Sequence, residues 1–241
     1  MSIKLICFDV DGTLLDDGDG TINIWQQIHR SAGVPEELNE QRFEMFMAGD
    51  ITYNEWMDMD VGDWQREGIK KGHLISVVKK MSLMPGTRET VNELLNRGYR
   101  LAIISGSIDF GIETLYPDHP FDPVLVNRVY FNDDGSISDW EATPFDLQEK
   151  QAGLQLVCEM HEVTRDECAF VGDNFNDVEA AAAAGFSIAF NSKSENLDEV
   201  ADVKLPGKDL RKMLEFFPDR GQALVDRGQG KLDGGETLSS F

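Results

Sequence analysis

The feature that most constrains the fold is a short apolar run near the start of the chain that ends in two aspartates. Residues 4–8 read Lys-Leu-Ile-Cys-Phe, and Asp9 and Asp11 follow one residue apart, before Gly12. An apolar run of this length is typical of a buried strand. Because side chains alternate along an extended chain, Asp9 and Asp11 point to the same side, and Gly12 permits a sharp turn. The pattern predicts two carboxylates in one cleft at the end of a strand.

Two carboxylates this close repel each other, which costs free energy unless a cation lies between them or they share a proton. The spacing of Asp9 and Asp11 therefore indicates a bound metal or a shared proton. An ordinary strand followed by an acidic turn is the alternative, since turns favour Asp and Gly.

Two later apolar runs also end in polar residues. Residues 100–104 are followed by Ser105 and Gly106, and residues 168–171 are followed by Gly-Asp-Asn-Phe-Asn-Asp, which ends at Asp177 and passes into an alanine-rich helix former. Each run is rich in residues that favour strands, and each is followed by helix-forming sequence. Strand and helix alternate, so the chain is predicted to have an α/β fold.

In chain order, these motifs resemble the four signature elements of the haloacid dehalogenase superfamily of phosphotransferases. The elements are Asp-x-Asp-Gly-Thr from Asp9, Ser-Gly at Ser105, a lysine at Lys150 that opens an amphipathic stretch, and Gly-Asp-x-x-Asn-Asp ending at Asp177. The likeness is greatest to the phosphoserine phosphatase branch. The resemblance implies a Rossmann-like, doubly wound parallel sheet, with a small helical cap domain inserted after the first strand.

The resemblance also implies roles for the two aspartates of the first motif. Asp9 is expected to be the nucleophile that forms an aspartyl phosphate, which divides one difficult displacement into two easier ones. Asp11 is expected to protonate the leaving alkoxide and later to take a proton from the attacking water. The cofactor implied is Mg²⁺, held by Asp9, the backbone carbonyl of Asp11, and Asp173. Magnesium prefers such hard oxygen ligands and bridges to substrate phosphate.

The remaining motifs are expected to bind phosphate and to support the metal site. Ser105, Gly106 and Lys150 would hold the phosphoryl oxygens, helped by the amino end of a helix that opens near residue 108. Asn176 and Asp177 would support the metal ligands. For Ser105 the alternative role is that of a helix N-cap, and both roles could hold at once.

We predict a catalytic core formed by residues 1–17 and 84–217, a helical cap at residues 18–83, and a C-terminal tail at residues 218–241. Residues 18–83 show little strand pattern, whereas the core regains strand and helix signals after residue 84. Helices are expected in the cap at residues 22–31, 36–47, 52–64 and 70–81. Further helices are expected at residues 87–96 and 210–217. The tail is expected to be mobile or to form a short appended helix near residues 222–226.

The cap is where the sequence departs from the phosphoserine phosphatases. Those enzymes carry a glutamate after the first motif and a cap arginine, which together bind the amine and the carboxylate of the substrate. Residues 15–22 contain no glutamate, and residues 53–60 contain no arginine. Asp60 would repel a substrate carboxylate, and Arg66 is a candidate that could reach inward in place of the arginine. Phosphoserine is therefore disfavoured as the substrate, and the sequence does not identify the leaving group.

Aromatic and methionine side chains are the candidates for a cap surface that faces the substrate. The candidates are Tyr53, Trp56, Met57 and Trp64. The alternative is that most of them form the core of the cap itself.

The composition limits the kinds of partner that the protein is expected to bind. The 241 residues include 44 acidic and 22 basic side chains, for a net charge of −22, which disfavours nucleic acid and anionic membranes as partners. The three cysteines form no C-x-x-C pair and read as reduced thiols of a cytoplasmic protein. We also expect no signal peptide and no membrane span. The sequence does not indicate an oligomeric state.

Together, these observations predict a magnesium-dependent phosphomonoester hydrolase that acts on a small phosphorylated metabolite through an aspartyl phosphate. Three alternatives stay open: phosphoserine phosphatase proper, a phosphotransferase or mutase of the same superfamily, and a binding protein on an inactive scaffold. The complete set of motif residues argues against the last of these, because a scaffold without chemistry has no need for all of them.

Overall fold

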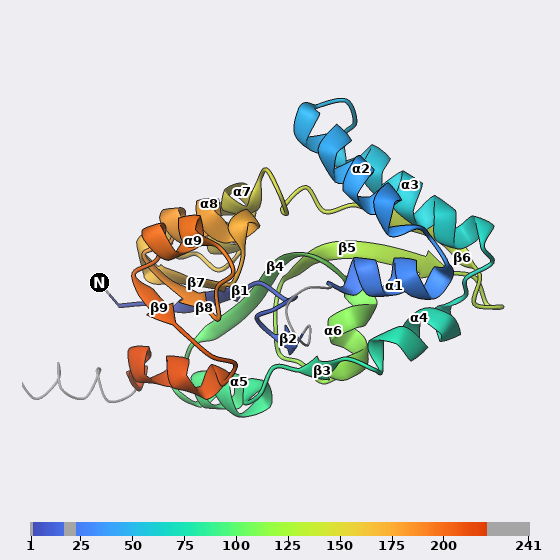
Figure 1. Cartoon of the computed structure of the whole chain (residues 1–241). Coiled ribbons are helices and arrows are strands. Elements are labelled where there is room, and N and C mark those ends of the chain that lie inside the picture. Colours follow the sequence, from blue (N-terminus) through green and yellow to red (C-terminus); the bar gives the residue numbers. More distant parts are fainter. Residues whose placement is uncertain (1, 17–22, 221–241) are drawn as a thin grey trace, which may run out of the picture.

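The computed structural model describes residues 2–16 and 23–220 of the chain. Within these residues, one seven-stranded sheet has the order β6-β5-β4-β1-β7-β8-β9 (Figure 1). All neighbouring strands are parallel except β5 and β6. The strands are β1 (Leu5–Phe8), β4 (Arg100–Ile108), β5 (Val124–Phe131), β6 (Ile137–Glu141), β7 (Cys168–Gly172), β8 (Phe186–Phe190) and β9 (Val203–Leu205). The predicted α/β fold with a mostly parallel sheet is confirmed.

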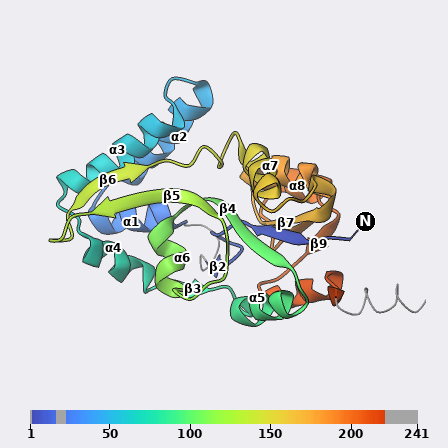
Figure 2. The same ribbon diagram turned by 180° about the vertical axis from the view of Figure 1, so that it is seen from behind.

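Helices cover both faces of this sheet (Figures 1 and 2). Strand β1 is buried along its whole length: Leu5 and Cys7 pack into the core under α7 and α8, and Ile6 and Phe8 pack into the core over α5 and η3. Two-sided burial explains why β1 is apolar without alternation. The covering elements are α5 (Thr87–Asn96), α7 (Lys150–Met160), α8 (Val178–Ala183), α9 (Glu195–Val200) and the 3₁₀ helix η3 (Leu210–Phe216).

The helices predicted in the core are present. The helix predicted at residues 87–96 is α5, and the one predicted at 210–217 is the 3₁₀ helix η3. Arg97, just after α5, donates to the carbonyls of Leu214 and Phe217, which ties η3 to the core. The helix predicted near residues 222–226 lies outside the described residues. No helix in residues 2–16 or 23–220 is long and apolar enough to span a bilayer.

Four helices follow the first strand, as predicted, and their bounds differ from the predicted ones by a few residues. They are α1 (Ile24–Ala32), α2 (Glu36–Ala48), α3 (Tyr53–Arg66) and α4 (Lys71–Val78). Capping boxes at Asn23 and Thr52 begin α1 and α3. On either side of these helices, β2 (Leu15–Asp16) pairs antiparallel with β3 (Ser82–Leu83), so the two chain segments that join the helices to the core lie side by side.

The β5–β6 hairpin extends from the sheet along these helices (Figure 1). Trp140 Nε1 donates to Asp58 Oδ1 at 2.6 Å, and Gln65 Nε2 donates to the carbonyl of Ile137 at 3.1 Å. The backbone N–H of Lys71 donates to the carbonyl of Gly135 at 2.8 Å. The hairpin, which turns at residues 132–136, therefore also fastens the helical region to the core.

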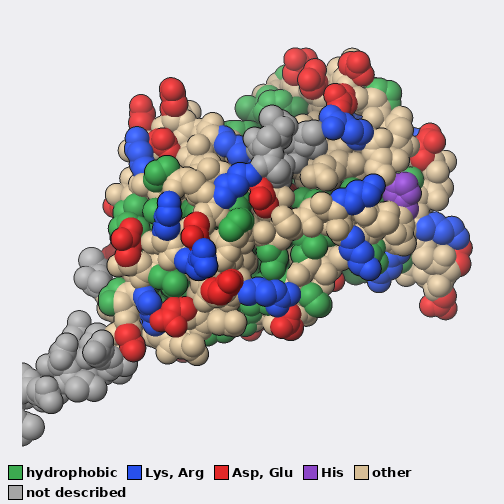
Figure 3. All heavy atoms as spheres, turned by 60° about the horizontal axis from the view of Figure 1, so that its bottom comes forward, with side chains coloured by type: hydrophobic (Ala, Val, Ile, Leu, Met, Phe, Trp, Pro, Cys, Tyr) green, Lys and Arg blue, Asp and Glu red, His purple; other side chains and the backbone are tan. Residues whose placement is uncertain are grey.

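The excess of acidic residues is not gathered on the face that carries α5 and η3. On this face, lysine and arginine side chains are interspersed with aspartate and glutamate (Figure 3). Ion pairs such as Arg97–Glu93 and Arg211–Asp209 belong to these elements. Exposed pairs of this kind contribute little stability individually, so the fold depends on its core rather than on them.

Asp109 opens α6 (Asp109–Leu115), and burial raises its pKa to about 6. Because this exceeds the unfolded value, ionisation of Asp109 costs stability: the cost is absent below about pH 4 and grows as the pH rises through about 6. We expect Asp109→Asn to raise the free energy of unfolding by up to about 2 kcal/mol at neutral pH and to change nothing at about pH 4. Denaturant titrations at the two pH values check this, with exposed Asp133→Asn as control. An equal difference at both pH values would contradict it.

Candidate active site

A pocket of about 410 Å³ opens between the helical region and the carboxyl ends of β1, β4 and β7. Open α/β sheets bind ligands at this edge, where the strand order reverses. Many residues predicted from the sequence line the pocket. They are Asp9, Asp11, Ser105, Gly106, Asn176, Tyr53 and Trp56.

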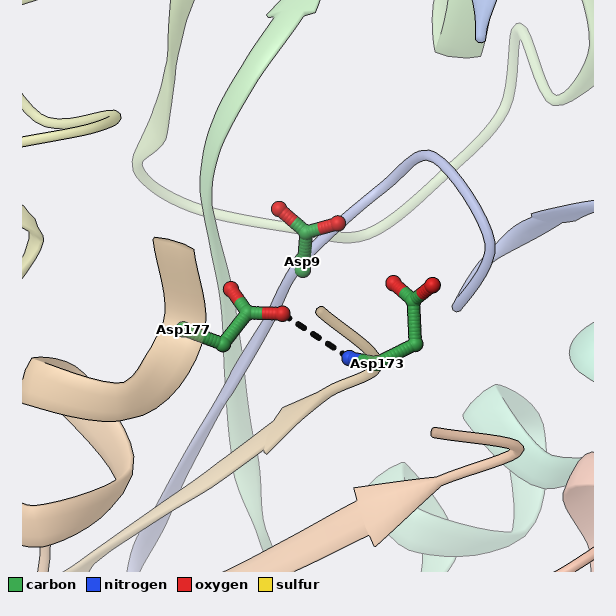
Figure 4. A group of neighbouring side chains, drawn as sticks. All are labelled: Asp9, Asp173 and Asp177. Carbon is green, nitrogen blue, oxygen red and sulfur yellow. Dashed lines mark hydrogen bonds between the residues drawn. The ribbon is translucent and has the colours of Figure 1, made fainter. Parts of the chain in front are cut away.

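Three aspartates converge beside the pocket. Asp9 follows β1, Asp173 follows β7, and Asp177 ends the 3₁₀ turn η2 (Phe175–Asp177) (Figure 4). One carboxylate oxygen from each lies within 4.8 Å of the others, and all three side chains are buried. Like charges this close are costly at low dielectric, so the cluster requires positive charge nearby.

Lys150, the first residue of α7, supplies part of that charge. Its side chain is 1% exposed, and its Nζ donates to Asp9 Oδ1 at 2.6 Å and to Asp177 Oδ1. Burial acts to lower the pKa of Lys150, but the carboxylates of Asp177 and Asp9 outweigh it and raise that pKa. Lys150 therefore stays charged. Burial raises the pKa of Asp9 well above its usual range, and Lys150 offsets only part of this rise.

Asp177 orients its neighbours. Its Oδ2 accepts a hydrogen bond from the backbone N–H of Asp173 at 2.8 Å (Figure 4). The same oxygen accepts from the backbone N–H of Asn174 at 3.0 Å, while Oδ1 accepts from Lys150. With both oxygens occupied in this way, Asp177 holds the loop after β7 and the lysine in place. Asp9 and Asp173 are then the carboxylates better placed to bind a cation.

The donor set fits a magnesium ion. Asp9, Asp11, Asp173 and Asp177 contribute carboxylates here, against the ammonium groups of Lys150 and Lys193, the latter 3.0 Å from Asp173 Oδ2. Carboxylate and carbonyl oxygens are the ligands that magnesium prefers. The backbone also fits closely here: a Cβ at Gly12 would lie 2.2 Å from Asp173 Oδ2, and its φ is +86°, so only glycine is tolerated.

Ser105 and Gly106 lie within β4, which corrects one expectation. Instead of ending at residue 104, the strand continues to Ile108 through an irregular register. Helix α6 begins at Asp109 and is only 7 residues long, so we assign no phosphate binding to its amino end. Ser105 is 1% exposed, and its Oγ accepts from the backbone N–H of Ser107 at 3.1 Å, which directs the hydroxyl proton elsewhere.

The family model for haloacid dehalogenase-like hydrolases matches residues 3–185. The chain belongs to this family. It is 30% identical to the phosphoserine phosphatase of Methanocaldococcus jannaschii over 89% of this chain and 97% of that one. It is also 30% identical to the phosphoserine phosphatase SerB2 of Mycobacterium tuberculosis, of which it spans 47%. A solved structure of a substrate-bound phosphoserine phosphatase complex matches with a TM-score of 0.71 and 27% identity, over 90% of this chain and 100% of that chain.

Within this haloacid dehalogenase-like site, sequence reasoning missed Asp146. Its Oδ2 accepts from the hydroxyl of Tyr53 at 2.9 Å, and its Oδ1 accepts from Asn176 Nδ2 at 2.9 Å. A Cβ at Gly106 would lie 2.1 Å from the Asp146 carboxylate carbon. Asp146 lies in a loop without a motif, and its position before Lys150 was the only available signal.

Asn127 is a second residue whose role the sequence did not show. Its Nδ2 donates to the carbonyl of Gly106 at 2.7 Å and to the hydroxyl of Tyr53 at 3.0 Å. Trp25 Nε1 donates to the same carbonyl at 2.9 Å. These bonds join β4, β5 and the helical region around the predicted phosphate-binding segment.

The other cap candidates divide between the pocket and the interior. Met57 lines the pocket with Tyr53 and Trp56, whereas Trp64 is fully buried and donates from Nε1 to His29 Nδ1 at 3.0 Å. Arg66 does not reach inward, since its side chain is 69% exposed and pairs with Asp63.

Tyr53→Phe is expected to weaken substrate binding in this site. Burial and the Asp146 carboxylate raise the pKa of Tyr53 well above its usual range, so its hydroxyl stays protonated and donates to Asp146. Loss of this bond leaves a partly buried carboxylate oxygen without its donor, at a cost of roughly 1–3 kcal/mol. We expect KM to rise about tenfold, with a smaller effect on kcat.

Steady-state kinetics of Tyr53→Phe measure both constants. Tyr130→Phe is the matched control, because its hydroxyl bonds exposed Glu141 far from the pocket. Unchanged KM in Tyr53→Phe would show that this contact between α3 and the core does not organise the site.

Proposed function

We propose that this chain hydrolyses small phosphomonoesters with the help of magnesium, through an aspartyl phosphate formed on Asp9. One observation carries the proposal: the Asp9 carboxylate lines the pocket, while Lys150 and two further buried aspartates surround it. The chain is a phosphoric monoester hydrolase of the haloacid dehalogenase-like type. The names of its relatives, phosphoserine phosphatase among them, support this reaction class.

The first half-reaction transfers the phosphoryl group to Asp9. With Oδ1 held by Lys150, Oδ2 of Asp9 attacks phosphorus, the P–O bond to the substrate alcohol breaks, and an acyl phosphate forms. The departing alkoxide takes a proton from the carboxyl group of Asp11, which also lines the pocket. The alcohol product then leaves.

The second half-reaction regenerates the enzyme. Asp11, now a carboxylate, removes a proton from water, whose oxygen attacks phosphorus and breaks the bond to Asp9. Lys150 offsets negative charge on the phosphoryl oxygens in both steps, and the hydroxyl of Ser105 donates a hydrogen bond to one of them. The products are inorganic phosphate and the free enzyme, in which Asp11 is protonated again.

Asp9, Asp173 and the backbone carbonyl of Asp11 would hold the magnesium ion. When bound, the ion supplies positive charge for the phosphoryl oxygens and offsets the repulsion of the aspartates. Asn176 and Asp177 support this arrangement through Asp146, Lys150 and the loop after β7.

The division into a core (residues 1–17 and 84–217), a cap (18–83) and a tail (218–241) is part of this proposal. The antiparallel pair β2–β3 lies where the chain passes between core and cap, and the pocket lies between the two. A cap in this position can exclude water from the acyl phosphate and select the leaving group.

The test is phosphate release from a panel of small phosphomonoesters, with and without magnesium, and with Asp9→Asn as the blank. Release that needs both magnesium and Asp9 supports the proposal. A burst of protein phosphorylation with slow phosphate release would instead favour a phosphotransferase or mutase. If magnesium stabilises the fold but no ester is hydrolysed, the result would favour a binding protein.

Phosphoserine phosphatase proper is the second candidate, favoured by the relatives named above. A specificity constant for phosphoserine far above those for all other panel members would establish it.

A further inference from the structure

The wall of the pocket that α2 and α3 form is aromatic. Phe43 from α2 and Tyr53 and Trp56 from α3 line it, and all three belong to one group of ring contacts. The ring centroids of Phe43 and Trp56 are 6.1 Å apart, and those of Tyr53 and Trp56 are 6.2 Å apart. Aromatic faces bind ammonium groups through their negative quadrupole, and more strongly where water is excluded.

The same wall carries acidic side chains. Asp60 and Glu40 line the pocket, and Asp60 is only 3% exposed. Among the described pocket-lining residues, the basic side chain is Lys193, which pairs with Asp173 at the metal end. Residues 17–22, outside the described part, contain no lysine, arginine or histidine in the sequence.

Arg42 lies behind Asp60 and is already occupied. It is buried, and it donates to Asp60 Oδ1 and Asp63 Oδ2, each at 2.5 Å. Asp60 and Asp63 share this buried guanidinium, and Asp63 also pairs with the exposed Arg66. To bind a substrate carboxylate, Arg42 would have to give up its bond to buried Asp60 or to partly buried Asp63, at a large cost.

His29 adds no positive charge beside Asp60. Trp64 Nε1 can only donate, so the His29 Nδ1 that accepts from it carries no proton. The ring proton is then on Nε2, which faces Asp60 Oδ2 at 3.2 Å, and the imidazole is neutral. The wall therefore presents carboxylates to the pocket without a cation that faces a ligand.

Two polar atoms of the pocket lining independently indicate a ligand. Ser107 Oγ and Trp56 Nε1 are both buried and have no hydrogen-bond partner among residues 2–16 and 23–220, and both residues line the pocket. Ser107 is 1% exposed. Buried donors without partners are rare and costly, and the phosphoryl and ester oxygens of a phosphate monoester would serve as acceptors for them.

We propose that the substrate is the phosphate monoester of an amino alcohol, with an ammonium group and no carboxylate. The inference rests on the proposed phosphatase function and names its substrate class. The phosphate lies at Asp9 and Ser105, and the ammonium group lies against the aromatic wall, between Glu40 and Asp60. A substrate carboxylate at that wall would meet negative charge and no arginine.

Four substrates separate the possibilities: phosphoethanolamine, phosphocholine, phosphoserine and glycerol 3-phosphate. Phosphoethanolamine differs from phosphoserine only by the carboxylate. We expect kcat/KM for phosphoethanolamine or phosphocholine to exceed that for phosphoserine at least about tenfold, which corresponds to about 1.4 kcal/mol. The inference would be overturned if phosphoserine had the highest kcat/KM of the four. The same holds for glycerol 3-phosphate, whose hydroxyls would then be bound by pocket amides such as Asn39.

Glu40→Gln tests the recognition of charge without disturbing a buried group, because Glu40 is exposed at the pocket. We expect KM for the preferred ammonium ester to rise about fivefold and KM for glycerol 3-phosphate to stay constant. Glu37→Gln, on the same helix but outside the pocket lining, is the matched control and should change neither. Equal effects of Glu40→Gln on both substrates would contradict an ammonium site.

Binding to the Asp9→Asn protein with magnesium separates this inference from the proposed function. Calorimetry on that protein should rank the four phosphates as above, whether or not the wild type turns over. If the ranking holds and no ester is hydrolysed, the phosphatase proposal fails and the ligand class stands. If hydrolysis depends on Asp9 but phosphoserine both binds and reacts best, the phosphatase proposal stands and the ligand class is wrong.

Discussion

Asp9→Asn is expected to abolish phosphate release while the protein stays folded. The amide oxygen can still accept a hydrogen bond from Lys150, which also keeps its partner Asp177, so no buried charge loses its last partner. An amide is a poor nucleophile, and removal of a covalent nucleophile typically lowers turnover by a factor of about 1,000 or more. The free energy of unfolding should change by no more than about 1 kcal/mol.

Phosphate release, thermal unfolding and mass spectrometry of the trapped intermediate check this expectation. The wild type should gain one phosphoryl group on the peptide that contains Asp9, and the variant none. Asp118→Asn is the control, because that carboxylate is exposed and pairs with Arg88 on the surface. Retained turnover in Asp9→Asn would remove Asp9 as nucleophile, and an unfolded variant would show that its carboxylate is structural.

The positions of the motif aspartates could be predicted because they depend on strand ends. In a parallel sheet the carboxyl ends of neighbouring strands share one edge, so β1 and β7 place Asp9 and Asp173 together whatever the intervening loops do. Lys150, at the start of α7, also lies beside these aspartates, but the sequence indicated it only through the order of the family motifs. For Asp9 and Asp173, the order of the strands and their direction determine most of the geometry of the site.

Asp146 and Arg42 could not be predicted because their roles depend on packing between distant elements. Asp146 meets Tyr53 across the pocket, 93 residues away in the sequence. Arg42 reaches Asp60 only because α2 and α3 pack together, and neither helix shows a pattern that marks the pair. Helical periodicity predicts which face is buried, but not which buried charges meet.

Lys150→Met is expected to have a large effect on both stability and activity. Methionine fills a similar volume, but Asp9 and Asp177 then lose their shared buried cation. Breaking a buried ion pair on one side typically costs about 3–5 kcal/mol, because the charge left behind is uncompensated. We expect a loss of this size in the absence of magnesium, together with near-complete loss of phosphate release.

Magnesium should restore part of that stability, since it would become the nearest cation to the aspartate cluster. The increase in Tm caused by magnesium is therefore expected to be larger in Lys150→Met than in the wild type. Turnover should stay low, because the variant lacks the ammonium group that would bind the phosphoryl oxygens. Lys204→Met is the matched control, because its exposed pair with Asp198 spans 3.8 Å and contributes little. Equal magnesium effects in Lys150→Met and the wild type would show that the metal does not share the charge balance of this cluster. A magnesium effect that grows in Lys150→Met, and not in Lys204→Met, would connect the buried lysine and the metal to the same carboxylates.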